Sequence, residues 1–148
     1  MNLTHRTALV TGATQGIGLA IARRMAQAGA DVVLHGIETA EAGGKIAAEL
    51  AAETGRRCAY VSANLSDSAA AAGLVAAATA ALTAPDILVN NAGIQHTCGI
   101  AEFPAERWDA VLAVNLSAAF HTMKAAVPGM RERGWGRIVN IASVNGLV

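Results

Sequence analysis

Short apolar stretches alternate along the chain with longer stretches in which apolar residues recur every three or four positions. The short stretches have the character of strands: Thr7–Thr11, Asp31–His35, Arg57–Ser62, Ile87–Asn90 and Ile138–Ala142. The longer ones have the character of helices: Gly16–Ala28, Thr39–Thr54, Ser66–Leu82 and Ala105–Arg133. The order βαβαβαβαβ predicts an α/β fold in which right-handed crossovers join the parallel strands of one sheet.

Three segments in these strands contain few polar residues: Ala8–Val10, Asp31–Leu34 and Ile138–Ile141. We expect helices to cover all three on both faces. Gly29 and Gly55 directly follow two of the helical stretches and predict where those helices end, because glycine readily adopts the left-handed conformation that closes a helix.

The stretch Ala105–Arg133 predicts one long amphipathic helix. Its apolar residues recur at three- and four-residue intervals: Trp108, Val111, Leu112, Leu116, Ala119, Met123 and Val127. Asn115 lies seven positions after Trp108 and is predicted to fall on the buried face. Because a buried amide needs hydrogen-bond partners, Asn115 is either a structural anchor or an active-site group.

Composition narrows the class of protein. The 148 residues predict a single domain, and 53% hydrophobic against 15% charged residues suits a sheet covered on both faces. Eleven basic and eleven acidic residues give a formal net charge of zero, and the arginines are dispersed, so nucleic acid is not expected as a partner.

The sequence also argues against a membrane partner, a disulfide and a metal site. No apolar run approaches the ~18 residues of a spanning helix, and the first residues lack the form of a signal peptide, so we expect a cytoplasmic protein without a membrane partner. Cys58 and Cys98 lack metal-site or disulfide spacing and are expected to be buried. The four histidines form no cluster, and no metal site is expected.

A glycine-rich turn follows the first strand. In the sequence Thr11–Gly18, Gly12, Gly16 and Gly18 lie between a strand and a helix, with the spacing T-G-x-x-x-G-x-G. Such glycines let backbone amides approach a pyrophosphate, whose charge then lies at the positive end of the helix. An ordinary tight strand-to-helix turn is the alternative.

Four motifs in this order resemble the short-chain dehydrogenase/reductase family: the glycine turn, Asn90-Asn91-Ala92-Gly93, Asn115, and Ile-Ala-Ser ending at Ser143. The resemblance covers the whole chain and implies a Rossmann-type doubly wound parallel sheet with strand order 3-2-1-4-5. The family normally continues through a Tyr-x-x-x-Lys helix, two more strands and a substrate loop. We therefore expect residues 1–148 to be a single but incomplete dinucleotide-binding domain, the N-terminal part of a longer protein.

The resemblance also implies a set of cofactor-binding residues. They are Gly12, Thr14, Gln15, Gly16, Ile17, Gly18, Gly36, Ile37, Asn64, Leu65, Asn91, Ala92 and Gly93. Within the set, the Asn-Asn-Ala-Gly turn would line the adenosine ribose. Asn64 replaces the family's aspartate near the adenine amine, where an amide oxygen still accepts a hydrogen bond.

The choice of cofactor depends on what meets the ribose 2′ position. Neither arginine nor lysine occurs at positions 35–39 or at Gln15, which favours NAD over NADP. Glu38 lies about 20 residues past Gly18, where an acid would accept the ribose hydroxyl. Glu38 could equally cap the helix that follows.

Of the family's catalytic set, this chain retains Ser143, which would polarise the substrate oxygen, and Asn115, which would support a proton relay. The general acid/base tyrosine and the lysine four residues later are not matched, because the only tyrosine, Tyr60, is followed by Asn64 at that spacing. Since general acid–base catalysis contributes about 10²–10⁴-fold to a rate, we expect these residues alone to be close to inert.

Within the family, the stretches 91–96 and 134–148 resemble 3-hydroxybutyrate dehydrogenases. Residues matching Gln95 and Ser143 would help to hold the small hydroxy acid, with Asn145 standing where that pattern has a histidine. Gln95 could equally be an ordinary polar loop residue. The resemblance thus implies NAD-dependent oxidation of 3-hydroxybutyrate to acetoacetate; the alternatives are another reductase, for 3-oxoacyl or sugar-acid substrates, and a nucleotide-binding module without catalysis.

A third alternative is a non-functional truncation product. The family is homo-oligomeric, and its long helix normally packs at a subunit interface, so Trp108, Leu112 and Leu116 are candidates for exposed apolar patches. Ending after Ser143 would leave the fifth strand as an open apolar edge, and such an edge favours aggregation.

Overall fold

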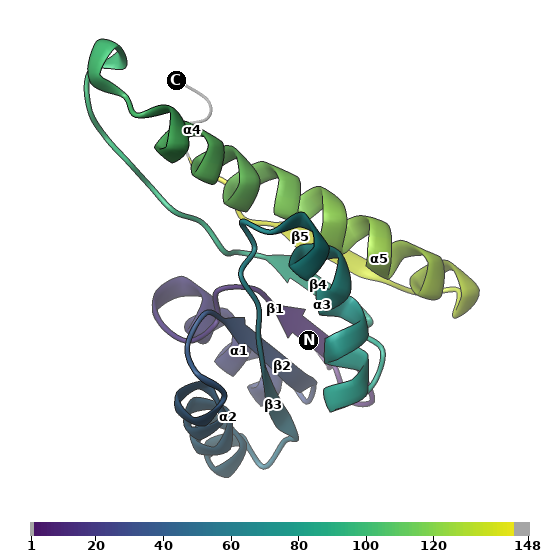
Figure 1. The fold of residues 1–148 in the computed structure, drawn as a ribbon. Helices are drawn as coiled ribbons and strands as arrows, with labels where there is room; N and C mark the ends of the chain where they lie inside the picture. The colour runs from purple at the N-terminus through teal and green to yellow at the C-terminus, as the bar shows by residue number, and fades with distance from the viewer. Residues whose placement is uncertain (1, 144–148) are drawn as a thin grey trace.

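The computed structural model describes residues 2–143 and contains one five-stranded parallel sheet of order β3-β2-β1-β4-β5 (Figure 1). The strands are β1 (Thr7–Val10), β2 (Asp31–Gly36), β3 (Cys58–Ser62), β4 (Ile87–Asn90) and β5 (Arg137–Asn140). The helices are α1 (Gly16–Gln27), α2 (Ala40–Thr54), α3 (Ser68–Ala81), α4 (Ala105–Leu112) and α5 (Ala118–Glu132), with a 3-10 turn η1 (Ile100–Glu102) and a π-helical turn η2 (Ala113–Ser117). The predicted element order and strand order are confirmed.

The core forms two layers, one on each face of the sheet (Figure 1). Alternate residues of a strand point to opposite faces, so Val10 packs with α1 and α2 whereas Leu9 packs with α3 and α5. Strands β1 and β2 are buried along their whole length, as the absence of polarity in their sequences predicts. Gly29 and Gly55 follow α1 and α2 with φ angles of 102° and 68°, which confirms the predicted helix ends.

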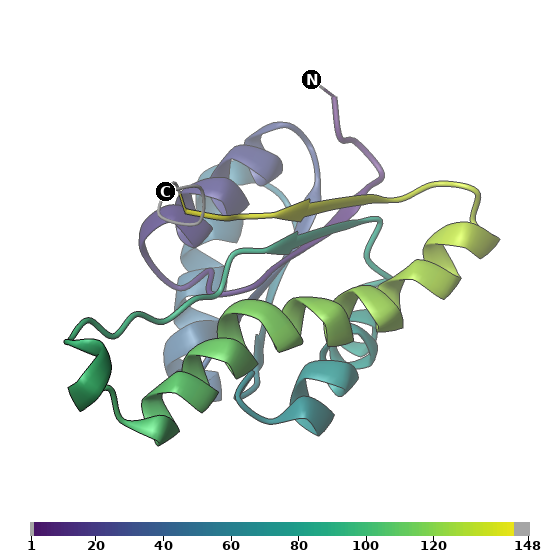
Figure 2. The same cartoon turned by 90° about the horizontal axis from the view of Figure 1, so that it is seen from above.

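The prediction that Ile138–Ile141 is covered on both faces is wrong. Strand β5 pairs with β4 alone and forms the edge of the described sheet (Figure 2), leaving Val139 43% and Ile141 42% exposed. Only Ile138 packs into the core, on the α3–α5 side. The sequence pattern of a doubly covered strand is present, but no helix of the described residues covers the other face of β5.

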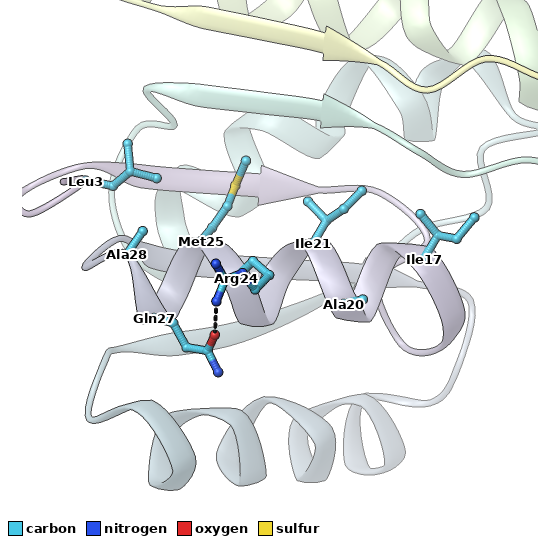
Figure 3. Close-up of a pocket in the computed structure, with 8 residues that line it drawn as sticks. All are labelled: Leu3, Ile17, Ala20, Ile21, Arg24, Met25, Gln27 and Ala28. Carbon is cyan, nitrogen blue, oxygen red and sulfur yellow. Dashed lines mark hydrogen bonds between the residues drawn. The ribbon is translucent and has the colours of Figure 1, made fainter. Parts of the chain in front are cut away.

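A second apolar surface lies along α1. A groove of about 650 Å³ is lined largely by apolar side chains, and Ile17, Ile21 and Met25 share one flank of the helix there (Figure 3).

The predicted helix Ala105–Arg133 is continuous from Ala105 to Glu132 and is built from α4, η2 and α5. The π-helical turn was not predicted; it adds a residue to the repeat at Asn115, and such turns often mark functional sites. Asn115 is exposed, which corrects the expectation that it lies on a buried face. Trp108, Leu112 and Leu116 are exposed as expected.

The expectation that no segment is long and apolar enough to span a membrane is also wrong. The helix Ala105–Glu132 is 28 residues long and contains an 18-residue stretch of mean hydropathy 1.3. The sequence argument counted unbroken apolar runs, and this stretch is interrupted by polar residues such as Asn115 and Lys124. Length and composition are weak evidence for a span, because an amphipathic helix at a protein interface meets the same criteria.

The two cysteines differ from the sequence expectation in part. Cys58 is half-buried on β3, where burial and the nearby Asp31 carboxylate raise the pKa of its thiol to about 11. Cys98 is exposed in the loop after β4, so the prediction that it is buried is wrong.

Core packing gives the first testable prediction. Leu88 of β4 is fully buried, so Leu88→Ala should lower the free energy of unfolding by about 2–5 kcal/mol, measured by urea denaturation. The matched control Leu116→Ala removes the same atoms from a side chain that is 65% exposed and should change stability by less than about 0.5 kcal/mol. Equal losses would contradict the two-layer core.

Candidate functional site

The turn between β1 and α1 is shaped by glycine. Gly12 and Gly16 have φ angles of 61° and 55°, which side-chain-bearing residues rarely adopt. A Cβ atom on Gly12 would lie 3.0 Å from Cα of Ala92, and one on Gly18 would collide with the carbonyl oxygen of Gly12. These close approaches leave the start of α1 uncovered by side chains, so its first backbone amides can approach an anion.

The turn after β4 is joined to the glycine turn by hydrogen bonds. The hydroxyl oxygen of Thr11 accepts from the backbone amides of Asn91 and Ala92, each at 2.9 Å. The Asn91 side-chain amide donates in return to the carbonyl oxygens of Thr11 at 2.9 Å and Gly12 at 3.1 Å. These hydrogen bonds hold the two turns together as one continuous surface, with Asn91 joining them.

His35, at the end of β2, completes this junction and was missed by the sequence analysis. Its ring is 2% exposed; Nδ1 accepts from the backbone amide of Gly12 at 3.2 Å, and Nε2 lies 3.0 Å from the carbonyl oxygen of Ala63. An N–H facing Nδ1 and a carbonyl facing Nε2 require a neutral ring with its proton on Nε2. Burial lowers the pKa of His35 and favours the same neutral form.

These turns enclose a cleft of about 510 Å³ at the carboxyl ends of β1, β2, β3 and β4. The structure brings to it all but one of the cofactor-binding residues predicted from the sequence: Gly12, Thr14, Gln15, Ile17, Gly18, Gly36, Ile37, Asn64, Leu65, Asn91, Ala92 and Gly93. The exception is Gly16, which shapes the turn without lining the cleft. His35, Glu38, Ser66, Ile94 and Val114 line it as well.

Glu38 lines the cleft and does not cap α2. The cap is Thr39, whose hydroxyl accepts from the backbone amide of Ala42 at 3.2 Å. Glu38 instead accepts a hydrogen bond from Thr14 at 2.8 Å and lies beside the Tyr60 hydroxyl. Burial alone would raise the pKa of Glu38, but the hydrogen bond from Thr14, those from backbone amides and that from Tyr60 outweigh it and lower the pKa, so the carboxylate is charged.

Asn64, after β3, is exposed at the cleft with its side-chain oxygen accepting from the backbone amide of Ser66 at 3.0 Å. A carbonyl oxygen has two lone pairs, so one acceptor site remains for a ligand donor.

The predicted reacting residues lie farther along the same edge of the sheet. Asn115 pairs with the backbone of Ile94 twice, accepting from its amide and donating to its carbonyl oxygen, both at 2.9 Å. It thereby fixes the loop that follows β4. Ser143 is exposed three residues after β5, whose pairing with β4 brings both strand ends to this edge.

The predicted substrate residues are only partly placed. Gln95 is exposed in the loop after β4, with Nε2 3.4 Å from the Thr97 hydroxyl, and does not line the cleft. Asn145 lies outside the described residues. Asn90, at the end of β4, accepts from the Thr122 hydroxyl at 2.8 Å and donates to Asn140 at 2.8 Å, and it too lies off the cleft.

The cleft fits a dinucleotide in shape and charge. The glycine turn leaves the N-terminus of α1 open to a pyrophosphate, a position in which backbone amides and the helix dipole both favour negative charge. The cleft also lies at the carboxyl ends of the strands, at the point where chain connections diverge to either side of β1, which is where open α/β sheets bind ligands.

Known proteins match both the sequence and the fold. The sequence model of one family, described as short chain dehydrogenase, matches residues 6–148. A D-beta-hydroxybutyrate dehydrogenase of Cupriavidus necator is 48% identical over 99% of this chain and 56% of its own length. Another of Rhizobium meliloti is 44% identical over 97% of this chain and 55% of its own length. The chain thus spans little more than half of these relatives.

Solved structures agree with the fold. A putative short-chain alcohol dehydrogenase from Sinorhizobium meliloti superposes with a TM-score of 0.92 at 37% identity, over 99% of this chain and 57% of that one. A 3-oxoacyl (acyl-carrier-protein) reductase from Agrobacterium tumefaciens with NADP bound superposes with a TM-score of 0.91 at 37% identity, over 99% of this chain and 55% of that one.

The buried His35 makes stability depend on pH. Because the unfolded chain binds a proton near pH 6.5 and the folded His35 resists it, the free energy of unfolding should be full above that pH and decrease as the pH falls below it. His35→Gln should weaken this dependence and, by removing the acceptor of the Gly12 amide, cost about 1–3 kcal/mol at about pH 8. Urea titrations between about pH 5 and 8 measure both effects.

The exposed His96 offers a matched control, since His96→Gln should retain the pH dependence of the parent protein. An unchanged pH dependence in the His35 variant would contradict the assigned neutral ring.

Proposed function

The chain belongs to the short chain dehydrogenase family, and from this we propose that it binds NAD and serves hydride transfer between NAD and a small hydroxy acid, with 3-hydroxybutyrate and acetoacetate as the reactant pair. The family is one of oxidoreductases that use a nicotinamide dinucleotide. The observation that carries the choice of substrate is the 48% identity with a D-beta-hydroxybutyrate dehydrogenase along nearly the whole chain. Activity of the full-length protein is part of the proposal, since the chain spans about half of that relative.

The proposed cofactor pose follows the lining of the cleft. The pyrophosphate would lie against the amides at Ile17 and Gly18 at the start of α1. The adenosine end would lie between Ile37 and Asn64, and the turn at Ala92 would face the riboses. When bound, the cofactor supplies the hydride acceptor; the residues of this chain bind it, orient it and hold the pyrophosphate charge.

NAD is preferred in this proposal because of charge. Among the described residues that line the cleft, Glu38 is the one charged group, and no arginine or lysine is there to receive a 2′-phosphate. A phosphate brought beside the Glu38 carboxylate would meet a like charge, whereas a ribose hydroxyl could donate a hydrogen bond to it. NADP is the rival cofactor, and it occupies the related reductase from Agrobacterium tumefaciens.

At the reacting end we propose that Ser143 holds the substrate oxygen, that Gln95 and Asn145 contact the hydroxy acid, and that Asn115 fixes the loop on which Gln95 lies. A proton acceptor must come from elsewhere. The one tyrosine of these 148 residues, Tyr60, lies on β3 against Glu38, and no tyrosine here precedes a lysine by four positions. We expect these 148 residues to bind NAD without measurable turnover.

The lack of a tyrosine followed four positions later by a lysine in these 148 residues favours a second candidate, a nucleotide-binding module without catalysis. It retains the whole cleft and needs no proton acceptor. A third candidate is reduction of 3-oxoacyl groups, which is favoured by the fold match to a 3-oxoacyl reductase with NADP bound and would use NADPH as the hydride donor.

The proposal includes self-association and a cytoplasmic location without a membrane partner. The exposed side chains of Trp108, Leu112, Leu116 and Phe120 form an apolar stripe on the helix Ala105–Glu132, as expected of a surface that another copy of the chain covers. Light scattering of the purified chain would give a defined oligomer under this proposal, and heterogeneous aggregates or detergent-dependent solubility would contradict it.

Cofactor binding is tested by placing a negative charge in the cleft. Ile17 is 67% exposed in the first turn of α1, so Ile17→Glu should leave the fold intact while repelling the pyrophosphate. We expect the NAD dissociation constant, measured by calorimetry, to rise at least about tenfold. Ile100→Glu makes the same change at a residue that is 88% exposed outside the cleft and should leave binding unaltered. If both variants bind alike, the cleft is not the site.

Turnover separates the candidate functions. The full-length protein should reduce NAD with D-3-hydroxybutyrate faster than it oxidises NADPH with a 3-oxoacyl thioester, and the 148 residues alone should do neither. A preference for the thioester and NADPH would replace the proposal by the 3-oxoacyl candidate. NAD binding without turnover of any hydroxy acid by the full-length protein would favour the binding module.

A further inference from the structure

Glu38 is held by the hydroxyl groups of two residues from different segments of the chain. The hydroxyl of Thr14, in the glycine turn, donates to Oε1 at 2.8 Å. The hydroxyl of Tyr60, on β3, donates to the backbone oxygen of Glu38 at 2.9 Å and lies 3.3 Å from Oε2. Thr14, Glu38 and Tyr60 thus form a hydrogen-bonded unit across three loops or strands, which we call the Glu38 clasp.

Two glycines make room for this clasp. A Cβ atom on Gly36 would collide with Oε2 of Glu38 and with the methyl group of Thr14, so the carboxylate can fold back over the end of β2 only because position 36 lacks a side chain. A Cβ atom on Gly43 would collide with the Tyr60 ring, so α2 lies against that ring only because position 43 lacks one too. Gly43 is a buried residue inside a helix, where glycine costs about 1 kcal/mol relative to alanine.

Within the clasp, Glu38 is a charged acceptor and Tyr60 is a neutral donor. Burial would raise the pKa of Glu38, but the hydrogen bonds from Thr14, from backbone amides and from Tyr60 lower it, and Glu38 is charged. Burial and the Glu38 charge raise the pKa of Tyr60, so its hydroxyl stays a donor. A free glutamate has three rotatable bonds and could turn away from an incoming phosphate, whereas a glutamate held from both sides cannot do so without losing these bonds.

We propose that Tyr60 and Thr14 are positioning residues for cofactor selection: by fixing the Glu38 carboxylate at the ribose end of the cleft, they prevent it from yielding to a 2′-phosphate and so exclude NADP. This inference rests on the proposed function, in which Glu38 faces the ribose of NAD. It assigns a role to the one tyrosine of these residues, which the catalytic resemblance leaves without one.

The test measures the ratio of the NADP and NAD dissociation constants by calorimetry. Tyr60→Phe removes the hydroxyl and keeps the ring against Gly43; Thr14→Val removes the other donor and keeps the side-chain shape. Each should lower the ratio about tenfold, mainly by tightening NADP binding, because Glu38 loses one of the two hydroxyl groups that fix it. Thr79→Val, which removes a hydroxyl on α3 away from the cleft, is the matched control and should leave the ratio unchanged.

A second set of variants asks whether the two residues act through Glu38. Glu38→Gln should itself lower the ratio, and adding Tyr60→Phe or Thr14→Val to it should lower the ratio no further. Unfolding midpoints of all variants separate an effect on cofactor selection from an effect on stability. A purely structural role would shift the midpoint and weaken the binding of NAD and NADP alike.

The outcomes are distinguishable. If Glu38→Gln alters the ratio and the Tyr60 and Thr14 variants do not, or if they alter it equally without the Glu38 charge, the clasp proposal is overturned while NAD binding stands. If the unmodified protein prefers NADP or binds neither cofactor, the proposed function fails and the clasp proposal fails with it.

Discussion

The parallel pairing of β1 between β2 and β4 is the constraint on which the site depends. It brings Val10 level with Leu34 on one side and with Val89 on the other. The three strands β1, β2 and β4 therefore end at the same edge of the sheet. A strand buried on both faces cannot slip by one residue without turning its side chains to the wrong layer, so the register of this edge is fixed by the core. The positions of the polar residues that follow these strand ends are therefore fixed by the same register.

Polar groups at this edge are arranged to satisfy the backbone rather than to face solvent. Asn91 and His35 occupy the carbonyl oxygen and the amide of Gly12, and both give up side-chain freedom to do so. Unpaired buried backbone groups would each cost about 1–3 kcal/mol, so the junction stabilises the fold and shapes the cleft with the same bonds. Among the described residues that line the cleft, Glu38 is then the one charged side chain left to meet a ligand.

Exposed apolar side chains lie on three other surfaces of the described residues. The side chains of the stripe on the helix Ala105–Glu132 and Val139 of the edge strand β5 are exposed. An open apolar groove runs along α1 (Figure 3). The stripe lies on the helix whose Asn115 holds the loop after β4. Contacts made by the stripe can therefore influence how firmly that loop is held, because Asn115 lies in the π-helical turn between its two ends.

The elements and their order could be predicted from the sequence, because they follow from the spacing of apolar residues and from glycines with special backbone angles. Most of the cleft was predicted from the resemblance of the sequence motifs to a known family. Twelve of thirteen cofactor-side residues predicted from it line one cleft. Features that depend on residues far apart in the sequence became visible in the folded structure alone. The hydrogen bonds of Asn115, and whether Glu38 caps a helix or joins Thr14 and Tyr60, are set by residues 21 or more positions away. The exposure of Cys98 and of β5 likewise depends on which other segments pack against them. A side chain's burial and hydrogen bonds belong to the packing of several segments, and no local pattern records them.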